Sequence, residues 1–452
     1  MSQRTKDMTS GRPAALIFTF ALPLMVGNVF QQLYTVVDTA VVGKALGVGA
    51  LAALGATDWL SWMMLGLVQG LTQGPSIRMA NHFGAKQDED LRITVGNATI
   101  LAIISAIVLF LLGQTAAEPV LRLLQTPDAV LPNAVTYLRI IYGGVPIIMA
   151  YNLFSAILRA LGDGKTPLIA MLIAAAINIA LDLLFVLVFH WGIPGAAAAT
   201  LIGQAFSAVF CLRQIRKLEI LRLKKQHFRP RGKLCLNLLL LGAPMAMQNL
   251  LISVGGLIVQ NVVNLCGVTF IAGFTATNKL YGVFELAAIA YGYAMITYVG
   301  QNVGAERIDR VKSGVRAACW IAVGTSVVIA ILMLVFGRLI LSCFLSGTPA
   351  EVEAAMSVAY RYLTFMCLCL PVLYLLYIWQ SSLRGLGNTF LPMLSGIAEF
   401  FVRAIGVHTL PGLIGSTGIF LSEVGAWFGA DLVLATSYFL LIRSIEKRRL
   451  LR

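Results

Sequence analysis

Long uninterrupted runs of apolar residues constrain the fold of this chain more than any other feature. Examples are residues 101–113, 168–189 and 321–336. A helix needs about 20 mostly apolar residues to cross the hydrocarbon core of a bilayer. Only 12% of the 452 residues are charged and 58% are hydrophobic, whereas about a quarter of a typical soluble domain is charged. The runs therefore predict an all-α membrane protein that crosses the bilayer many times.

The apolar runs predict twelve transmembrane helices. We place them at residues 14–42, 52–79, 95–117, 134–158, 167–190, 195–218, 236–265, 272–301, 314–340, 355–383, 390–410 and 418–442. The first run is too long for a signal-peptide core and no small-residue cleavage site follows it, so we interpret it as an uncleaved span.

The basic residues predict the orientation of these spans. If the N-terminus is cytoplasmic, the even-numbered connections and both termini hold nearly all the loop Lys and Arg residues. The outer connections then hold only Lys44, Arg122 and Arg338. Because cytoplasmic loops of membrane proteins are enriched in Lys and Arg, this distribution places both termini in the cytoplasm.

The second half of the chain repeats the first. Pro23 is echoed by Pro244, residues 83–85 by 303–305, and 158–162 by 383–387. Each half has six spans, so both halves enter the membrane in the same direction, and such repeats are related by an axis along the membrane normal with the substrate path between them. We therefore expect an N-terminal six-helix lobe at 1–220, a cytoplasmic basic linker at 221–235 and a C-terminal six-helix lobe at 236–452.

The net charge of +14 could indicate a nucleic-acid partner, but its distribution favours a membrane role. The densest basic cluster lies between two apolar spans in mid-chain, from Arg213 to Lys233. Positive-inside orientation and contact with anionic lipid headgroups are sufficient to explain it. We therefore expect the lipid bilayer, and no nucleic acid, as a partner. The seven cysteines are scattered and suggest small packing residues rather than disulfides or metal ligands.

Four polar residues inside the first-half spans form a candidate cation or proton site: Asp38, Asn178, Asp182 and Thr200. Asn178 and Asp182 are four residues apart and share one helix face. From their positions in the spans, the acids and Thr200 lie roughly 6–12 Å below the outer surface. Two close carboxylates would share one proton, and with the added oxygens the same cluster suits a hard cation such as sodium. The alternative is that these residues only hydrogen-bond neighbouring helices.

The second half lacks this acidic cluster but carries other charged residues inside its spans. Glu399 and Arg403 are four residues apart on one helix face, which suits an internal ion pair. Glu285 is a candidate for a second protonation or substrate-cation site. We keep Glu285, Glu399 and Arg403 as residues for possible second-lobe coupling. Pro23 kinks its helix in this prediction, and the kink either couples protonation of Asp38 to helix bending or shapes the helix statically.

These features together resemble the multidrug and toxic compound extrusion (MATE) family. The resemblance covers the whole chain and rests on the twelve spans, the six-plus-six repeat, the Gly-Ala pairs at 84–85 and 304–305, and the Leu-Arg-x-Leu-Gly turns at 158–162 and 383–387. It implies a V-shaped pair of pseudo-symmetric six-helix bundles that alternates between outward-open and inward-open states. In the DinF-like branch, an aspartate in span one, an Asn-x-x-x-Asp pair in span five and a threonine in span six bind a cation or proton. Asp38, Asn178, Asp182 and Thr200 stand at those places.

The resemblance implies an antiporter that couples entry of protons or sodium to export of organic cations or amphipathic drugs. The rival within the same superfamily is a flippase for lipids or lipid-linked oligosaccharides, which would need cavity cations; those available are Arg139, Lys279, Arg361 and Arg403. An enzyme is disfavoured because the four histidines are dispersed without ligand spacing. We expect no catalytic residues, no metal and no cofactor besides the coupling ion. We also expect a monomer in the inner membrane of a prokaryote.

Overall fold

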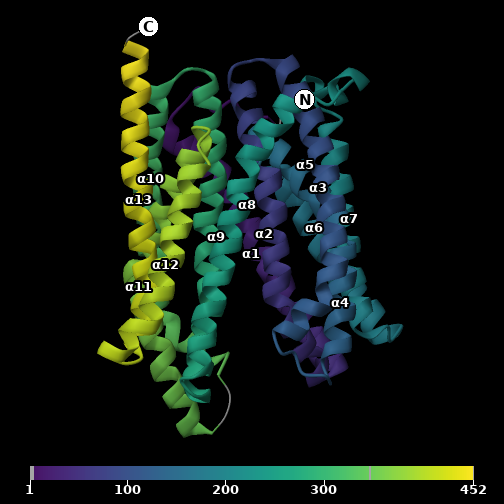
Figure 1. The fold of residues 1–452 in the computed structure, drawn as a ribbon, viewed down its shortest axis with the longest axis vertical. Helices are drawn as coiled ribbons and strands as arrows, with labels where there is room; N and C mark the ends of the chain where they lie inside the picture. The colour runs from purple at the N-terminus through teal and green to yellow at the C-terminus, as the bar shows by residue number, and fades with distance from the viewer. Residues whose placement is uncertain (1–4, 346–347, 451–452) are drawn as a thin grey trace. The chain divides into compact units, whose positions relative to one another are not determined.

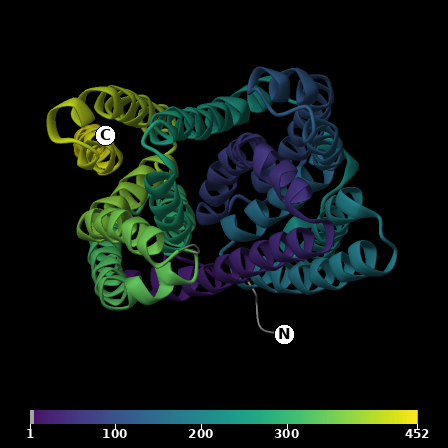
Figure 2. The same ribbon diagram turned by 90° about the horizontal axis from the view of Figure 1, so that it is seen from below.

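The computed structural model describes residues 5–345 and 348–450, and the regular secondary structure of these residues is entirely helical. Within these residues the side chains at 33–40, 43, 44, 48, 51, 449 and 450 are outside the description. Within each half of the chain, neighbouring long helices run side by side (Figures 1 and 2). In a bilayer the apolar faces of helices contact lipid, so a chain of this composition does not need to bury all its apolar side chains in a core.

The described residues form thirteen α-helices, one π-helix and two short 3-10 turns. In chain order the first part contains α1 (Pro13–Leu46), α2 (Val48–Gly84), α3 (Asp88–Leu123), α4 (Leu131–Gly143), α5 (Val145–Ala160), α6 (Lys165–Asp182), the π-helix η1 (Leu183–Val188), α7 (Gly192–Ile215) and the turns η2 (Glu219–Leu221) and η3 (Lys225–Phe228). The second part contains α8 (Gly232–Asn264), α9 (Val268–Gly304), α10 (Ile308–Ser342), α11 (Pro349–Gly385), α12 (Phe390–Ile414) and α13 (Thr417–Leu450).

The predicted spans all correspond to helices of the structure. Ten helices of the described residues are long and apolar enough to cross a membrane, and the bent pair α4–α5 makes an eleventh. The remaining predicted span, 52–79, lies in α2, which is 37 residues long. The predicted twelve-helix membrane fold is therefore confirmed in its all-α class and its helix count.

The chain packs into two compact units. Unit 1 comprises the described residues of Met1–Ser10, Leu22–Met247 and Gly300–Glu306, and unit 2 those of Gly11–Ala21, Gln248–Val299 and Arg307–Arg452. This division splits α1, α8 and α9 between the units. The lobes predicted from the repeat, 1–220 and 236–452, keep those helices whole and stay a prediction.

Proline bends one predicted span but not its equivalent in the repeat. The span predicted at 134–158 is broken at Gly144, where α4 and α5 meet at 46°, and Pro146 occupies the first turn of α5. Pro371, at the equivalent place, lies inside the continuous helix α11. Pro23 likewise lies inside α1, which continues as a helix to Leu46. Because the first turn of a helix needs no internal N–H donor, Pro146 is accommodated best where a new helix begins.

Two glycines allow very close backbone contacts in unit 1. A Cβ atom on Gly84, at the end of α2, would overlap the carbonyl oxygen of Gln301, and one on Gly304 would overlap the carbonyl oxygen of Asn81. These glycines belong to the Gly-Ala pairs of the repeat. The repeated pairs therefore correspond to a reciprocal backbone contact between the last turns of α2 and α9, which only glycine permits.

We expect Gly84→Val to destabilise the protein by about 1–3 kcal/mol, because the added side chain must push the two backbones apart. Thermal unfolding of the purified protein in detergent measures the effect. Gly324→Ala is the control, since a Cβ on Gly324 in α10 meets no atom within 4 Å and alanine favours the helix. A Gly84→Val protein that unfolds at the wild-type temperature would contradict this interpretation.

Candidate functional site

The polar site in unit 1 begins with two residues at the end of α6. Asn178 and Asp182 lie one turn apart, with side chains that are 3% and 0% exposed. At Asp182 the α-helix ends and the chain continues as the π-helix η1. A π-helical segment widens the turn and is found frequently at functional sites. The change in helix type at this acid was not predicted from the sequence, which gave one regular span over 167–190.

Thr200 on α7 completes this part of the site. The Asn178 side-chain amide donates to the Thr200 hydroxyl at 3.4 Å, and that hydroxyl is 3.2 Å from the carbonyl oxygen of Ala196. Gly203 lies one turn further along α7, where a Cβ atom would meet the carbonyl oxygen of Ala174 at 3.0 Å. The small residue thus lets α7 approach α6 closely. Asn178 and Thr200 therefore meet across the helix pair as the sequence led us to expect.

The fourth predicted residue, Asp38, lies in α1. Its side chain is outside the described residues, so its place in the site stays a prediction.

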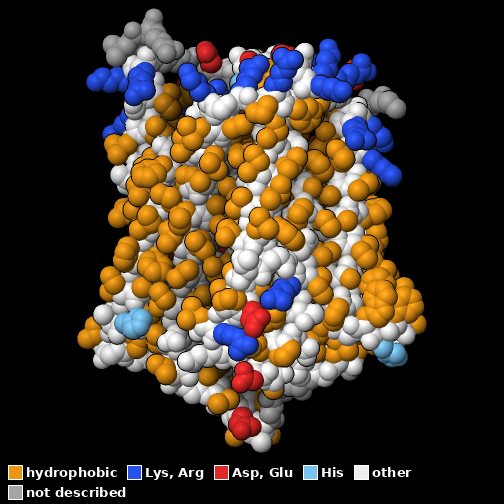
Figure 3. Space-filling model, turned by 45° about the vertical axis from the view of Figure 1, so that its right-hand side comes forward, with side chains coloured by type: hydrophobic (Ala, Val, Ile, Leu, Met, Phe, Trp, Pro, Cys, Tyr) orange, Lys and Arg blue, Asp and Glu red, His pale blue; other side chains and the backbone are white. Residues whose placement is uncertain are grey.

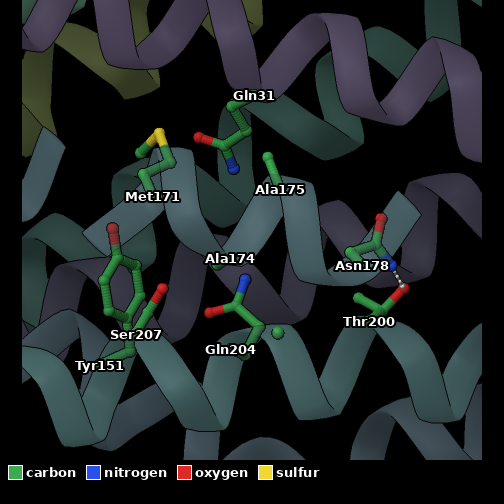
Figure 4. Close-up of a pocket in the computed structure, with 10 residues that line it drawn as sticks. Gln31, Tyr151, Met171, Ala174, Ala175, Asn178, Thr200, Gln204 and Ser207 are labelled. Carbon is green, nitrogen blue, oxygen red and sulfur yellow. Dashed lines mark hydrogen bonds between the residues drawn. The ribbon is translucent and has the colours of Figure 1, made fainter. Parts of the chain in front are cut away.

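A small cavity lies beside Asn178 and Thr200 (Figure 4). Its volume is about 30 Å³, which is room for one or two water molecules. Polar side chains from α1, α5, α6 and α7 surround it, together with small residues and Met171. The polar lining residues are Gln31, Tyr151, Asn178, Thr200, Gln204 and Ser207.

Two buried amide oxygens at this cavity have no hydrogen-bond partner among the described residues. They are Oδ1 of Asn178 and Oε1 of Gln204. A buried acceptor without a partner costs free energy, and bound water or a cation offsets that cost. Gln204 was not among the predicted site residues. Its position one turn after Thr200 on α7 is the only sequence signal that could have identified it.

Unit 2 contains a separate buried charged cluster. The Arg403 guanidinium lies 2.9 Å from the Glu399 carboxylate and 3.3 Å from the Glu423 carboxylate. The Arg403 and Glu399 side chains are each less than a tenth exposed. The predicted ion pair between Glu399 and Arg403 is therefore present, and Glu423 from α13 is a third member that the sequence analysis missed. Only the packing of α12 along α13 brings it there.

Glu285 on α9 lies in a different environment from the pair on α12. It accepts a hydrogen bond from the Tyr281 hydroxyl at 3.3 Å and another from the Tyr377 hydroxyl of α11. Tyr281 in turn stacks on Trp427, with ring centroids 5.8 Å apart. Glu285 is thus held in place by aromatic residues, whereas Glu399 is held by an arginine.

Two of the four cations that a flippase could use are paired with carboxylates. Arg139 lies 3.5 Å from Glu118 in unit 1, and Arg403 is held between two carboxylates in unit 2. Lys279 is exposed on α9.

Comparison with known proteins identifies the family. A family model described as MatE matches residues 23–184 and 244–408, more than half of the chain and one segment in each half. The chain belongs to the MatE family. The match to both halves also agrees with the internal repeat.

Relatives of this MATE transporter cover nearly its whole length. The "Probable multidrug resistance protein YoeA" of Bacillus subtilis is 28% identical over 93% of this chain and 91% of its own. The "FAD transporter" of Shewanella oneidensis is 24% identical over 79% of this chain and 78% of its own. An outward-facing multidrug resistance MATE transporter of known structure has a TM-score of 0.91 at 20% identity, covering 97% of this chain and 98% of that one. The chain is therefore a multi-pass membrane transporter with the MATE fold, as predicted.

Proposed function

We propose that this MATE transporter exports organic cations or amphipathic drugs from the cytoplasm in exchange for protons or sodium ions. The ion binds in unit 1 at Asp182, Asn178 and Thr200, with Asp38 as a further ligand. Proton or sodium entry at this site drives the outward release of the substrate. A downhill ion can do this only if it binds one conformation of the transporter better than another.

The observation that supports this proposal is a buried acid one helical turn from a buried amide oxygen that has no partner among the described residues. Asp182 is fully buried in a membrane helix, where an ionisable residue costs roughly 2.5–3.5 kcal/mol. Asn178, one turn before it on α6, donates to the Thr200 hydroxyl, and both of these residues line a cavity of about 30 Å³. Carboxylate, amide and hydroxyl oxygens are the ligands that hard cations prefer. A residue pattern that served only to join helices would not leave the Asn178 oxygen without a partner among the described residues.

The names of several relatives support drug export, and the charges of the chain disfavour the flippase alternative. A pyrophosphate-linked lipid needs several unpaired cations, whereas Arg139 and Arg403 are already paired with carboxylates. An organic cation needs no such cluster. The relative named as an FAD transporter leaves an anionic substrate as the alternative to exclude.

Accumulation of ethidium in bacterial cells tests the proposal. Cells that express the wild-type chain are expected to retain less dye than cells with an empty vector, and Asn178→Leu is expected to return retention to the vector level. Asn237→Leu on α8 is the control, because Asn237 is exposed. Equal retention in wild-type and vector cells, for ethidium and for tetraphenylphosphonium, would argue against export of organic cations.

We also expect Thr200→Val to weaken the apparent affinity for the coupling ion about tenfold. Valine keeps the shape of threonine but removes the oxygen that meets the Asn178 amide at 3.4 Å, and a lost hydrogen bond costs about 1 kcal/mol or more. Transport measured against increasing ion concentration reports the change. The control is Thr136→Val, at an exposed position of α4, which is expected to show the ion dependence of wild type. If the ion dependence of Thr200→Val is also unchanged, Thr200 is not a ligand of the ion.

A further inference from the structure

The segment between α7 and α8 is fixed in place rather than free. It carries the turns η2 and η3 and lies along the beginning of α3. The Arg92 side chain donates to the Ile220 carbonyl oxygen at 2.9 Å. A Cβ atom on Gly96 would overlap the carbonyl oxygen of His227, so the segment touches the backbone of α3 directly. This contact requires glycine at that position of α3.

Asn97 is the central residue of this attachment. Its side chain is fully buried. Its Oδ1 accepts a hydrogen bond from the Arg231 backbone N–H at 2.8 Å, and its Nδ2 lies 3.4 Å from the His227 carbonyl oxygen. Asn97 therefore contacts the backbone of the segment at His227 and at Arg231, which are four residues apart.

His227 provides a second attachment point. It is 1% exposed, its Nδ1 accepts from the Lys224 backbone N–H at 2.9 Å, and its Nε2 lies 3.0 Å from the Glu89 carboxylate. A linker that only joined two spans would not require a buried asparagine and a buried histidine to hold it against α3. The attachment therefore serves to hold the outer face of the segment in one arrangement.

That outer face is strongly basic. Its side chains are exposed, and among the described residues the only ion pair of this face joins Arg222 to Glu219. The basic platform consists of Arg213, Arg216, Lys217, Arg222, Lys224, Lys225, Arg229, Arg231 and Lys233. Lys and Arg side chains gather at one end of the molecular face in Figure 3, above a broad band of hydrophobic side chains.

The platform lies where the membrane surface must be. It follows α7 and precedes α8, which are both long and apolar enough to span the bilayer. The first turns of α8 expose Leu236 and Leu240 by 55% and 58%. Cations directly followed by exposed apolar side chains match a phospholipid, whose charged headgroup adjoins its acyl chains.

We propose that this platform is a built binding site for the headgroups of anionic phospholipids. The cations contact the phosphate groups, and the exposed leucines of α8 contact the acyl chains. The attachment to α3 through Asn97 and His227 fixes the spacing of the cations. The site is independent of the ion and substrate sites proposed above.

Binding of dioleoylphosphatidylglycerol to the purified full-length protein in detergent tests the proposal. Native mass spectrometry counts the retained lipids, and thermal unfolding reports the stabilisation; dioleoylphosphatidylcholine is the reference lipid. We expect wild type to retain and be stabilised by the anionic lipid and to prefer it to the neutral one. The variant Lys224→Ala/Lys225→Ala/Arg229→Ala is expected to bind the anionic lipid on the order of a hundredfold more weakly, since each cation near an anionic surface accounts for roughly fivefold.

Two further variants separate a built site from general charge attraction. Arg443→Ala/Lys447→Ala/Arg448→Ala removes the same charge from exposed positions at the end of α13 and is expected to behave as wild type. Asn97→Leu keeps every cation but releases the segment, and is expected to lose the preference for the anionic lipid. Equal losses in the two triple variants, or no preference of wild type for the anionic lipid, would overturn the proposal. An unchanged preference in Asn97→Leu would show that the attachment does not build the site.

Discussion

Replacing Asp182 by asparagine is expected to reduce ion-driven export by about tenfold to a hundredfold, since interactions with a charged group contribute about 1.5–3 kcal/mol. Asparagine has nearly the same shape as aspartate, but it can neither take up a proton nor supply a negative charge to a cation. Asp182 is fully buried at the junction of α6 and η1. Dye efflux from proteoliposomes under an imposed ion gradient measures the loss.

Asp128→Asn is the matched control for this substitution, because Asp128 is exposed in the connection before α4. It is expected to transport as wild type does. The Asp182→Asn protein is expected to unfold near the wild-type temperature, because asparagine keeps the shape of aspartate and can still form hydrogen bonds. Normal efflux by Asp182→Asn would exclude this acid from ion coupling.

The second large effect is expected at Arg403. Arg403→Leu removes the only cation that contacts the carboxylates of Glu399 and Glu423 among the described residues. Breaking a buried pair by removing one partner destabilises a protein by about 3–5 kcal/mol, because it leaves uncompensated buried charge. Thermal unfolding in detergent is expected to show a large decrease in stability.

A compensating variant distinguishes this electrostatic explanation from a loss of packing. Glu399→Gln/Arg403→Leu/Glu423→Gln carries no charge in the cluster and is expected to recover most of the lost stability. Arg139→Leu is the control, since Arg139 is half exposed and surface pairs contribute about 0–1 kcal/mol. If the triple variant is as unstable as Arg403→Leu, packing of the arginine side chain rather than its charge holds the helices.

The helices could be predicted from the sequence because apolar runs of membrane length have no alternative to helix in a bilayer. The break inside 134–158 could not, since Pro146 and Pro371 occupy equivalent places in the repeat and only Pro146 lies at a helix break. The tertiary neighbours of a proline decide whether a helix bends or restarts. The π-helix after Asp182 was missed for a similar reason, because local hydropathy is the same for α and π geometry.

The candidate site was partly predictable. An acid in a predicted span is conspicuous, so Asp182 and its neighbour Asn178 could be singled out and Thr200 placed at a similar depth. Gln204 could not be distinguished from a packing residue without the cavity that its oxygen faces. Glu423 required knowledge of which face of α13 meets α12. Helix pairing in three dimensions, rather than spacing along the chain, determines both.

The most direct test of ion-coupled export by unit 1 is efflux of ethidium from proteoliposomes under a proton gradient and then under a sodium gradient of equal size. The chain is expected to export dye under one of the two gradients and to stop when that gradient is collapsed, and Asp182→Asn is expected to export under neither. The gradient that works identifies the coupling ion. Export of dye by wild type and Asp182→Asn alike, or by neither protein under either gradient, would contradict the proposed mechanism.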